Sequence, residues 1–117
     1  MEIKTDKGTI EISNEVFTTI CGCAATNCFG VKGMAIRTVT DGLVHLLKKE
    51  AMSKGVKVRS DADGKLIVEL HIIVEYGVNI AAISRAIISE VTYVVERLTG
   101  VAVSQVDICV DSIMKSE

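Results

Sequence analysis

The residues best suited to bind a metal or to react as thiols are three cysteines close together in the chain, Cys21, Cys23 and Cys28. Thiolates bind zinc when further cysteines or histidines lie at short spacing from them. The segment is predicted to be helical, and at about 100° per residue Cys21 and Cys23 point to nearly opposite sides. Cys21 and Cys28 share a side but lie about 10 Å apart along the axis, which is too far for one ion. We therefore predict no metal site at these cysteines.

The cysteines are better explained as small hydrophobic groups of the kind that pack in protein cores. They contribute to a broad apolar arc of the predicted helix, made of Val16, Phe17, Ile20, Cys23, Ala24 and Cys28. A redox-sensitive thiol is the alternative that this arrangement leaves open. The segment thus predicts packing rather than catalysis.

A second short motif could bind a ligand. The residues Gly30, Val31, Lys32 and Gly33 match the GxxG loop that grips the nucleic-acid backbone in KH domains. A lone GxxG is a weak signal, and the ordinary interpretation of the same residues is a turn that ends a helix. No HExxH motif, phosphate-binding glycine loop or Ser–His–Asp spacing occurs, so we predict no catalytic residue, no metal and no cofactor.

The composition is that of a single globular domain, residues 1–117, long enough to bury a core without disulfides or metals. The formal net charge is −2, so no bulk attraction to nucleic acid or anionic lipid is expected. Aromatic residues make up only 3%, too few for a surface that stacks bases. The charged amino-terminal segment predicts no signal peptide, and no apolar run approaches the roughly 18 residues of a membrane-spanning helix. We therefore expect a cytoplasmic protein with no direct membrane span.

Hydrophobic periodicity and capping residues define the elements of the first half of the chain. They predict a strand at 8–13, a helix from 14 to about 27, a loop at 30–33, a strand at 34–39 and a helix at 40–55. The second of these helices has its cap at its first two residues and a terminating glycine at its end.

The second half predicts a strand at 56–59, a hairpin turn at Asp63-Gly64, a strand at 65–76, a helix at 79–99 and a strand at 101–113. The helix carries a regular apolar stripe, namely Ile80, Ile83, Ile87, Val91, Val94 and Leu98. This order of elements predicts an α+β fold, with a single mixed β-sheet and about three helices packed on one of its faces.

The strand at 65–76 alternates between two faces. Its apolar row, which must face the core, is Leu66, Val68, Leu70, Ile72, Val74 and Tyr76. Its other row includes Ile67, Glu69, His71, Ile73 and Glu75, which must therefore face outward. The outward residues of the last strand, Asp107, Cys109 and Asp111, are expected on the same side.

This outward row is the candidate surface for a protein partner or for a second copy of the chain. The isoleucines would supply apolar contact, the charged residues would set the register, and His71 could act as a pH-sensitive contact. The alternative is a solvated sheet face, on which single exposed isoleucines are ordinary.

Several stretches together resemble one known family. They are GTIEIS before a helix that ends AATNCFGVKGM, SKGVKV before a hairpin, LHIIVEYGVNI, and a helix that ends VVERLTGVAVSQVDICV. Over nearly the whole chain this is similar to the alkaline shock protein 23 family, the YloU-like cell-envelope-related proteins of mainly Gram-positive bacteria. Where members often carry AASEVPGV, this chain has AATNCFGV, so Cys28 occupies a usually aliphatic position.

The resemblance implies a single alkaline-shock-protein-like domain without enzymatic activity. It implies a cytosolic protein that is related to cell-envelope homeostasis or stress. The outward row of the strand at 65–76 adds the expectation of a binding or scaffold protein that acts through protein–protein contacts and self-association. The resemblance further implies a protein partner, such as a small membrane-anchored protein that would hold the chain at the inner face of the membrane. No nucleic acid is expected, and the alternative is a KH-like RNA-binding domain that uses the Gly30–Gly33 loop.

Overall fold

One strand, β6 (Leu66–Glu75), organises the sheet, because three other strands pair with it. β5 (Val56–Ser60) runs antiparallel to its first half, and β3 (Val31–Arg37) runs antiparallel to its second half. β7 (Val103–Met114) runs parallel to β6 along its whole length, and β4 (Val44–Leu46) extends the sheet beyond β3. The result is the predicted α+β fold with a mixed, five-stranded sheet.

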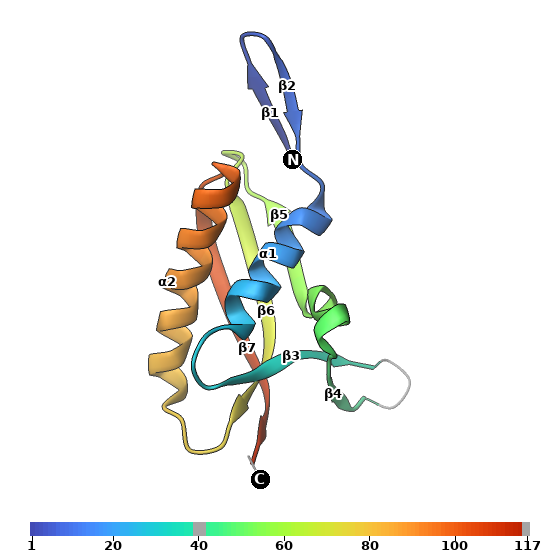
Figure 1. Cartoon of the computed structure of the whole chain (residues 1–117), viewed down its shortest axis with the longest axis vertical. Coiled ribbons are helices and arrows are strands. Elements are labelled where there is room, and N and C mark those ends of the chain that lie inside the picture. Colours follow the sequence, from blue (N-terminus) through green and yellow to red (C-terminus); the bar gives the residue numbers. More distant parts are fainter. Residues whose placement is uncertain (39–41, 116–117) are drawn as a thin grey trace.

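The computed structural model describes residues 1–38 and 42–115. Its helical elements are α1 (Asn14–Thr26), the 3₁₀ helix η1 (Lys49–Gly55) and α2 (Ile80–Thr99). Figure 1 shows α1 crossing in front of the sheet and α2 running beside it on the same side. The core between helices and sheet is built from buried side chains that include Phe17, Cys21, Met34, Leu70, Ile72, Ile87 and Val91.

The last helix forms as its sequence predicts. The Asn79 side chain caps α2 by accepting a hydrogen bond from the Ala82 backbone N–H at 3.0 Å. Gly100 ends the helix with a φ of 74°, which a residue with a side chain rarely adopts. The residues buried along the helix are Ile83, Ile87, Val91 and Val95. Ile80 and Leu98 were expected in this row but are exposed, because they lie in the terminal turns, outside the packed part of the helix.

The predicted helix at 40–55 is wrong. Val44–Leu46 forms β4 instead, and only Lys49–Gly55 is helical, as the 3₁₀ helix η1. The backbone reverses at Gly42, which has a φ of 68°, and the Leu47 N–H then donates to the Met34 carbonyl at 2.8 Å. Pairing with β3 therefore outweighs the local helical pattern. The expected cap at residues 40 and 41 lies outside the described residues, as does position 39 of the expected strand at 34–39.

Two further differences concern the strands. The expected loop at 30–33 is wrong, because β3 already begins at Val31 and pairs with β6. The strand expected at 8–13 ends at Glu11 as β2 (Gly8–Glu11), which pairs with an unpredicted strand, β1 (Glu2–Thr5). These two form a separate hairpin that stands out from one end of the molecule (Figure 1).

The alternation of β6 is confirmed through most of its length, but fails at its end. Leu66, Val68, Leu70, Ile72 and Val74 are all buried in the core. Tyr76 was expected to be buried with them, but it follows the last residue of the strand and is 67% exposed. Ile73 was expected to be an exposed contact residue, but it is only 1% exposed.

The burial of Ile73 has a local cause on the outward side of the sheet. Ile73 pairs with Gly33 of β3, and the side chain of Leu46 from β4 lies over Gly33, only 2.7 Å from the point that a Cβ on this glycine would occupy. Ala35 and Ile73 are buried there without belonging to the main core. β3 and β4 therefore shield this end of the outward side.

Candidate functional site

The candidate site lies on the sheet face opposite the main core, which we call the outward face. It is formed by alternate residues of three paired strands. β5 pairs with β6 so that Lys57 lies beside Glu69, and β7 pairs with β6 so that Cys109 lies beside His71. The residues of the outward face are Lys57, Arg59, Ile67, Glu69, His71, Gln105, Asp107, Cys109 and Asp111.

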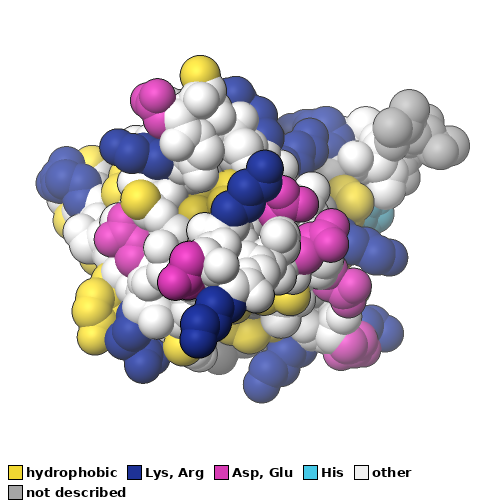
Figure 2. Space-filling model, turned by 90° about the horizontal axis from the view of Figure 1, so that it is seen from above, with side chains coloured by type: hydrophobic (Ala, Val, Ile, Leu, Met, Phe, Trp, Pro, Cys, Tyr) yellow, Lys and Arg dark blue, Asp and Glu magenta, His cyan; other side chains and the backbone are white. Residues whose placement is uncertain are grey.

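Most charges on the outward face are separated by strand, and the carboxylate of Glu69 on β6 lies between the two sets. β5 contributes the two exposed cations, Lys57 and Arg59, and β7 contributes the two carboxylates, Asp107 and Asp111. Ile67 lies between these strands in a shallow hollow of about 140 Å³, which Lys57, Arg59 and Asp107 help to line. The centre of the face thus offers a half-buried apolar side chain flanked by opposite charges. By contrast, Figure 2 shows that basic and acidic side chains are interspersed over the end of the molecule that it presents.

His71 bridges two carboxylates. Its Nε2 lies 2.6 Å from Glu69 Oε2, and its Nδ1 lies 2.9 Å from Asp111 Oδ2. The hydrogen bond from His71 is the main cause that lowers the pKa of Glu69, and Lys57, whose Nζ is 3.9 Å from Glu69 Oε2, lowers it further. Glu69 is therefore ionised at neutral pH. The sequence predicted that Glu69 and His71 share a face, but it gave no sign of the bond to Asp111.

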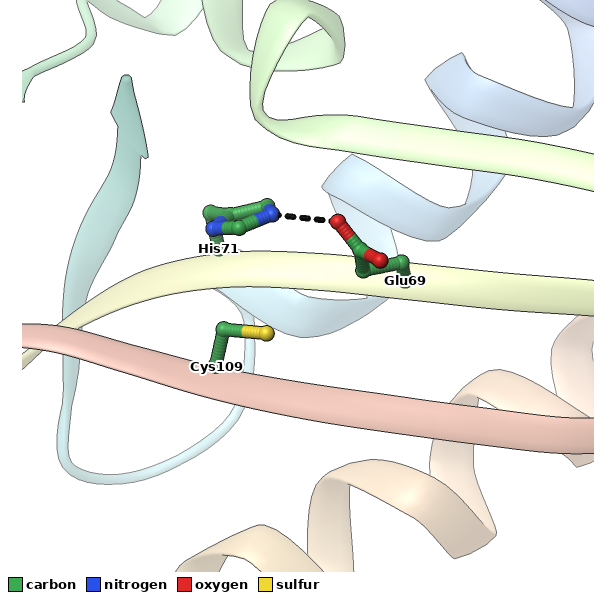
Figure 3. A group of neighbouring side chains, drawn as sticks. All are labelled: Glu69, His71 and Cys109. Atoms are coloured by element: carbon green, nitrogen blue, oxygen red, sulfur yellow. Dashed lines mark hydrogen bonds and ion pairs between the residues drawn. The ribbon is translucent and has the colours of Figure 1, made fainter. Parts of the chain in front are cut away.

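Cys109 lies beside this bridge. Figure 3 shows its thiol on β7 next to the Glu69 carboxylate and the His71 ring on β6. Burial raises the pKa of the Cys109 thiol, and the carboxylates of Glu69, Asp111 and Asp107 raise it further. The group is therefore a neutral thiol at physiological pH and not an activated nucleophile. Sequence reasoning placed Cys109 on this side, but only the β6–β7 register brings it next to His71.

The outward residues predicted from the sequence are only partly brought together. Ile67, Glu69 and His71 lie on the same face as expected, and Glu75 lies half-buried at the last position of β6. Ile73 is covered and offers no surface to a partner. The role of these residues as a contact surface remains a prediction.

The three amino-terminal cysteines lie in different environments. Cys21 is fully buried, which raises the pKa of its thiol to about 12. The Cys28 thiol is half-buried and donates to the Ala24 carbonyl at 3.3 Å. These two pack as expected, whereas Cys23 was expected in the apolar arc and is exposed. The rotation of about 200° between positions 21 and 23 explains why only one of the pair can face the core.

A group of exposed apolar residues lies at the end of the molecule where β6 and β7 finish, and the sequence did not predict it. We call it the apolar end, and it comprises Phe29, Tyr76, Ile113 and Met114. Backbone hydrogen bonds hold the segments that carry these residues side by side. The Tyr76 N–H donates to the Met114 carbonyl, and the Glu75 N–H donates to the Gly30 carbonyl, next to Phe29. Phe29 is 82% exposed.

No helix in the described part of the chain is long and apolar enough to cross a membrane.

Comparison with known proteins gives a consistent assignment. Residues 2–115 match the alkaline shock protein 23 family, whose description is a cell envelope-related function. The uncharacterized protein YloU of Bacillus subtilis is 38% identical over 97% of this chain and 94% of its own length. The uncharacterized protein Spy1614 of Streptococcus pyogenes is 36% identical over 97% of this chain and 93% of its own length. No solved structure matches the chain at a significant level.

Proposed function

This chain belongs to the alkaline shock protein 23 family, and we propose that it serves the family's cell envelope-related function as a non-catalytic scaffold that associates with copies of itself. In this proposal the protein lies in the cytoplasm and reaches the inner face of the membrane through a small membrane-anchored protein partner. Its contribution to envelope homeostasis and stress tolerance is to hold partners in place.

The observation that carries the proposal is the charge pattern of the outward face. Cations lie on β5 and carboxylates lie on β7, and the strand between them carries Ile67 and Glu69, whose carboxylate pairs with Lys57 of the same copy. A two-fold axis that lies between two such faces and runs parallel to β6 brings the β5 strand of one copy over the β7 strand of the other. Each cation row then meets a carboxylate row, and the two Ile67 side chains meet near the axis. The surface is therefore complementary to itself.

The chemistry of the face supports binding rather than catalysis. Both ring nitrogens of His71 are engaged by carboxylates, so neither is open to take a proton from a substrate. The one thiol beside it has a raised pKa and so lacks the thiolate character of a nucleophile. The residues best placed to contact a partner are thus the charged rows and Ile67.

The proposal is tested by sedimentation velocity of the full chain and two single variants. Ile67→Asp places a charge at the centre of the outward face and should shift the protein to monomer. Ile88→Asp is the matched control, because Ile88 is an exposed isoleucine on α2, and it should sediment like wild type. Circular dichroism checks that both variants stay folded. A monomeric wild type, or equal loss of association in both variants, would contradict the proposal.

A charge exchange provides a second arm of the same test. Arg59→Glu and Asp107→Arg should each weaken association, because each sets like charges opposite one another across the two-fold axis. The double variant restores opposite charges on the two strands and should recover association. Additive loss in the double variant would show that these residues do not meet across an interface.

A further inference from the structure

The outward face also brings together the three types of donor atom that zinc accepts from proteins. Glu69, His71 and Cys109 offer one carboxylate oxygen, one imidazole nitrogen and one sulfur, all within 4.8 Å of one another (Figure 3). In the described part of the chain, they are the one group of three such side chains that lies this close. We propose that these residues form a binding site for a divalent transition metal, for which zinc is the best match.

The positions of the donors fit this proposal with small side-chain movements. In tetrahedral zinc sites the bond lengths place neighbouring donor atoms roughly 3.3 to 3.6 Å apart. The His71 Nε2 to Glu69 Oε2 separation of 2.6 Å must widen, because a metal replaces the shared proton between them. The Cys109 sulfur lies within 4.8 Å of both other donor atoms. All three side chains are half-buried, so the fourth position stays open to solvent.

Asp111 completes the arrangement from the outer side. Its carboxylate lies 2.9 Å from His71 Nδ1, within hydrogen-bond distance, and so fixes the ring with Nε2 directed at Glu69. Histidines that bind metals commonly donate their second N–H to a carboxylate, which orients the ring and strengthens the metal bond. Asp111 is therefore a positioning residue of the proposed site and not one of its ligands.

Charge and protons balance on binding. The zinc ion displaces the proton of the Cys109 thiol, and any proton on His71 Nε2, to solvent. The bound cluster then holds two positive charges on the metal and one negative charge each on Cys109 and Glu69. The Lys57 ammonium lies 3.9 Å from Glu69, and its side chain is 74% exposed, so it can turn away when the metal enters.

Cobalt(II) is the probe for this site, because it takes the same geometry as zinc and reports a thiolate ligand by its absorption. The metal-free, reduced full chain should bind one equivalent of cobalt with the spectrum of a tetrahedral thiolate complex, and zinc should displace it. Cys109→Ser and His71→Gln should abolish that spectrum. Asp111→Asn should retain it with about 10- to 100-fold weaker binding.

Matched controls separate this site from the other cysteines and histidine. Cys23→Ser removes an exposed thiol on α1, and His45→Gln removes the other histidine, so both variants should bind cobalt like wild type. Circular dichroism confirms that each variant is folded, and Cys109→Ala replaces Cys109→Ser if the latter is not. Absence of the thiolate absorption, or its persistence in Cys109→Ser, would overturn the proposal.

The test is independent of the proposed scaffold function. Ile67→Asp leaves all four residues of the metal arrangement in place, so the monomeric variant should bind cobalt with unchanged stoichiometry. Metal binding in a protein that never associates would support the site and contradict the scaffold. Loss of binding in the folded Ile67→Asp variant would overturn the assignment of the ligands to one chain.

Discussion

Cys21 and Cys23 lie two positions apart on α1 but have opposite environments, one fully buried and the other exposed. The buried thiol has its pKa raised to about 12 from an ordinary value of 9.0, because the core does not solvate a thiolate. The sequence predicted that these cysteines pack rather than bind metal. It wrongly placed Cys23 in the apolar arc, because the orientation of a helix is set by the sheet beneath it and not by its own sequence.

The buried thiol should make stability sensitive to alkaline pH. The raised pKa means that the folded state keeps a proton which the unfolded state loses above pH 9.0. The contribution of Cys21 is therefore complete below pH 9.0 and is lost as the pH rises toward 12. We expect the melting temperature of wild type to fall more steeply over this range than that of Cys21→Ala. At neutral pH, Cys21→Ala should be about 1 kcal/mol less stable. Parallel alkaline profiles for the two proteins would refute this prediction.

At the scale of elements, the capping of the two main helices can be compared directly. The Asn79 side chain accepts a hydrogen bond at the start of α2, whereas Ser13 at the start of α1 makes no such bond. We expect Asn79→Ala to lower the free energy of unfolding by about 1 kcal/mol, and Ser13→Ala by less than about 0.5 kcal/mol. Urea unfolding measures both. Equal losses would show that the side-chain cap of α2 contributes nothing.

The contact between η1 and β3 depends on a residue without a side chain. A Cβ at Gly55 would lie 3.0 Å from both the Ala35 carbonyl oxygen and the Met34 Cβ, and the backbone atom cannot easily move away. Gly55→Ala should therefore destabilise the protein by about 1–3 kcal/mol. Gly8→Ala is the control, because no atom lies within 4 Å of the position of its Cβ. Unchanged urea midpoints for Gly55→Ala would show that η1 can shift without cost.

The sequence predicted those elements that are determined by residues close together in the chain. α2 has a cap, a regular stripe and a terminating glycine, so its bounds were predicted almost to the residue. The segment at 44–55 also looked helical, but β3 offers its backbone a pairing partner, and a contact distant in sequence decided the outcome. Ile73 followed the alternation of β6 correctly but is covered by neighbouring strands. Coverage of this kind depends on the packing of distant segments, which periodicity does not show.

At the scale of the whole molecule, the helices cover one side of the sheet and leave β5, β6 and β7 with a second, half-exposed side. The sequence predicted this two-sided arrangement and the β6 residues of the outward face. The neighbours of His71 on β7 could not be predicted, because two parallel strands are joined by a long crossover, here α2, and not by a tight turn that would set their register. The proposed metal site depends on that register, and the proposed self-association depends on the charge rows it aligns.

The most direct test of the outward face is a dilution series followed by methyl NMR with labelled isoleucines. Three isoleucines report on three surfaces: Ile67 on the outward face, Ile88 on α2 and Ile113 at the apolar end. On association, the Ile67 methyl signal should shift or broaden with concentration, and the Ile88 and Ile113 signals should stay in place. An Ile67 signal that stays constant while Ile113 or Ile88 moves would contradict the proposed self-association and assign the interface elsewhere.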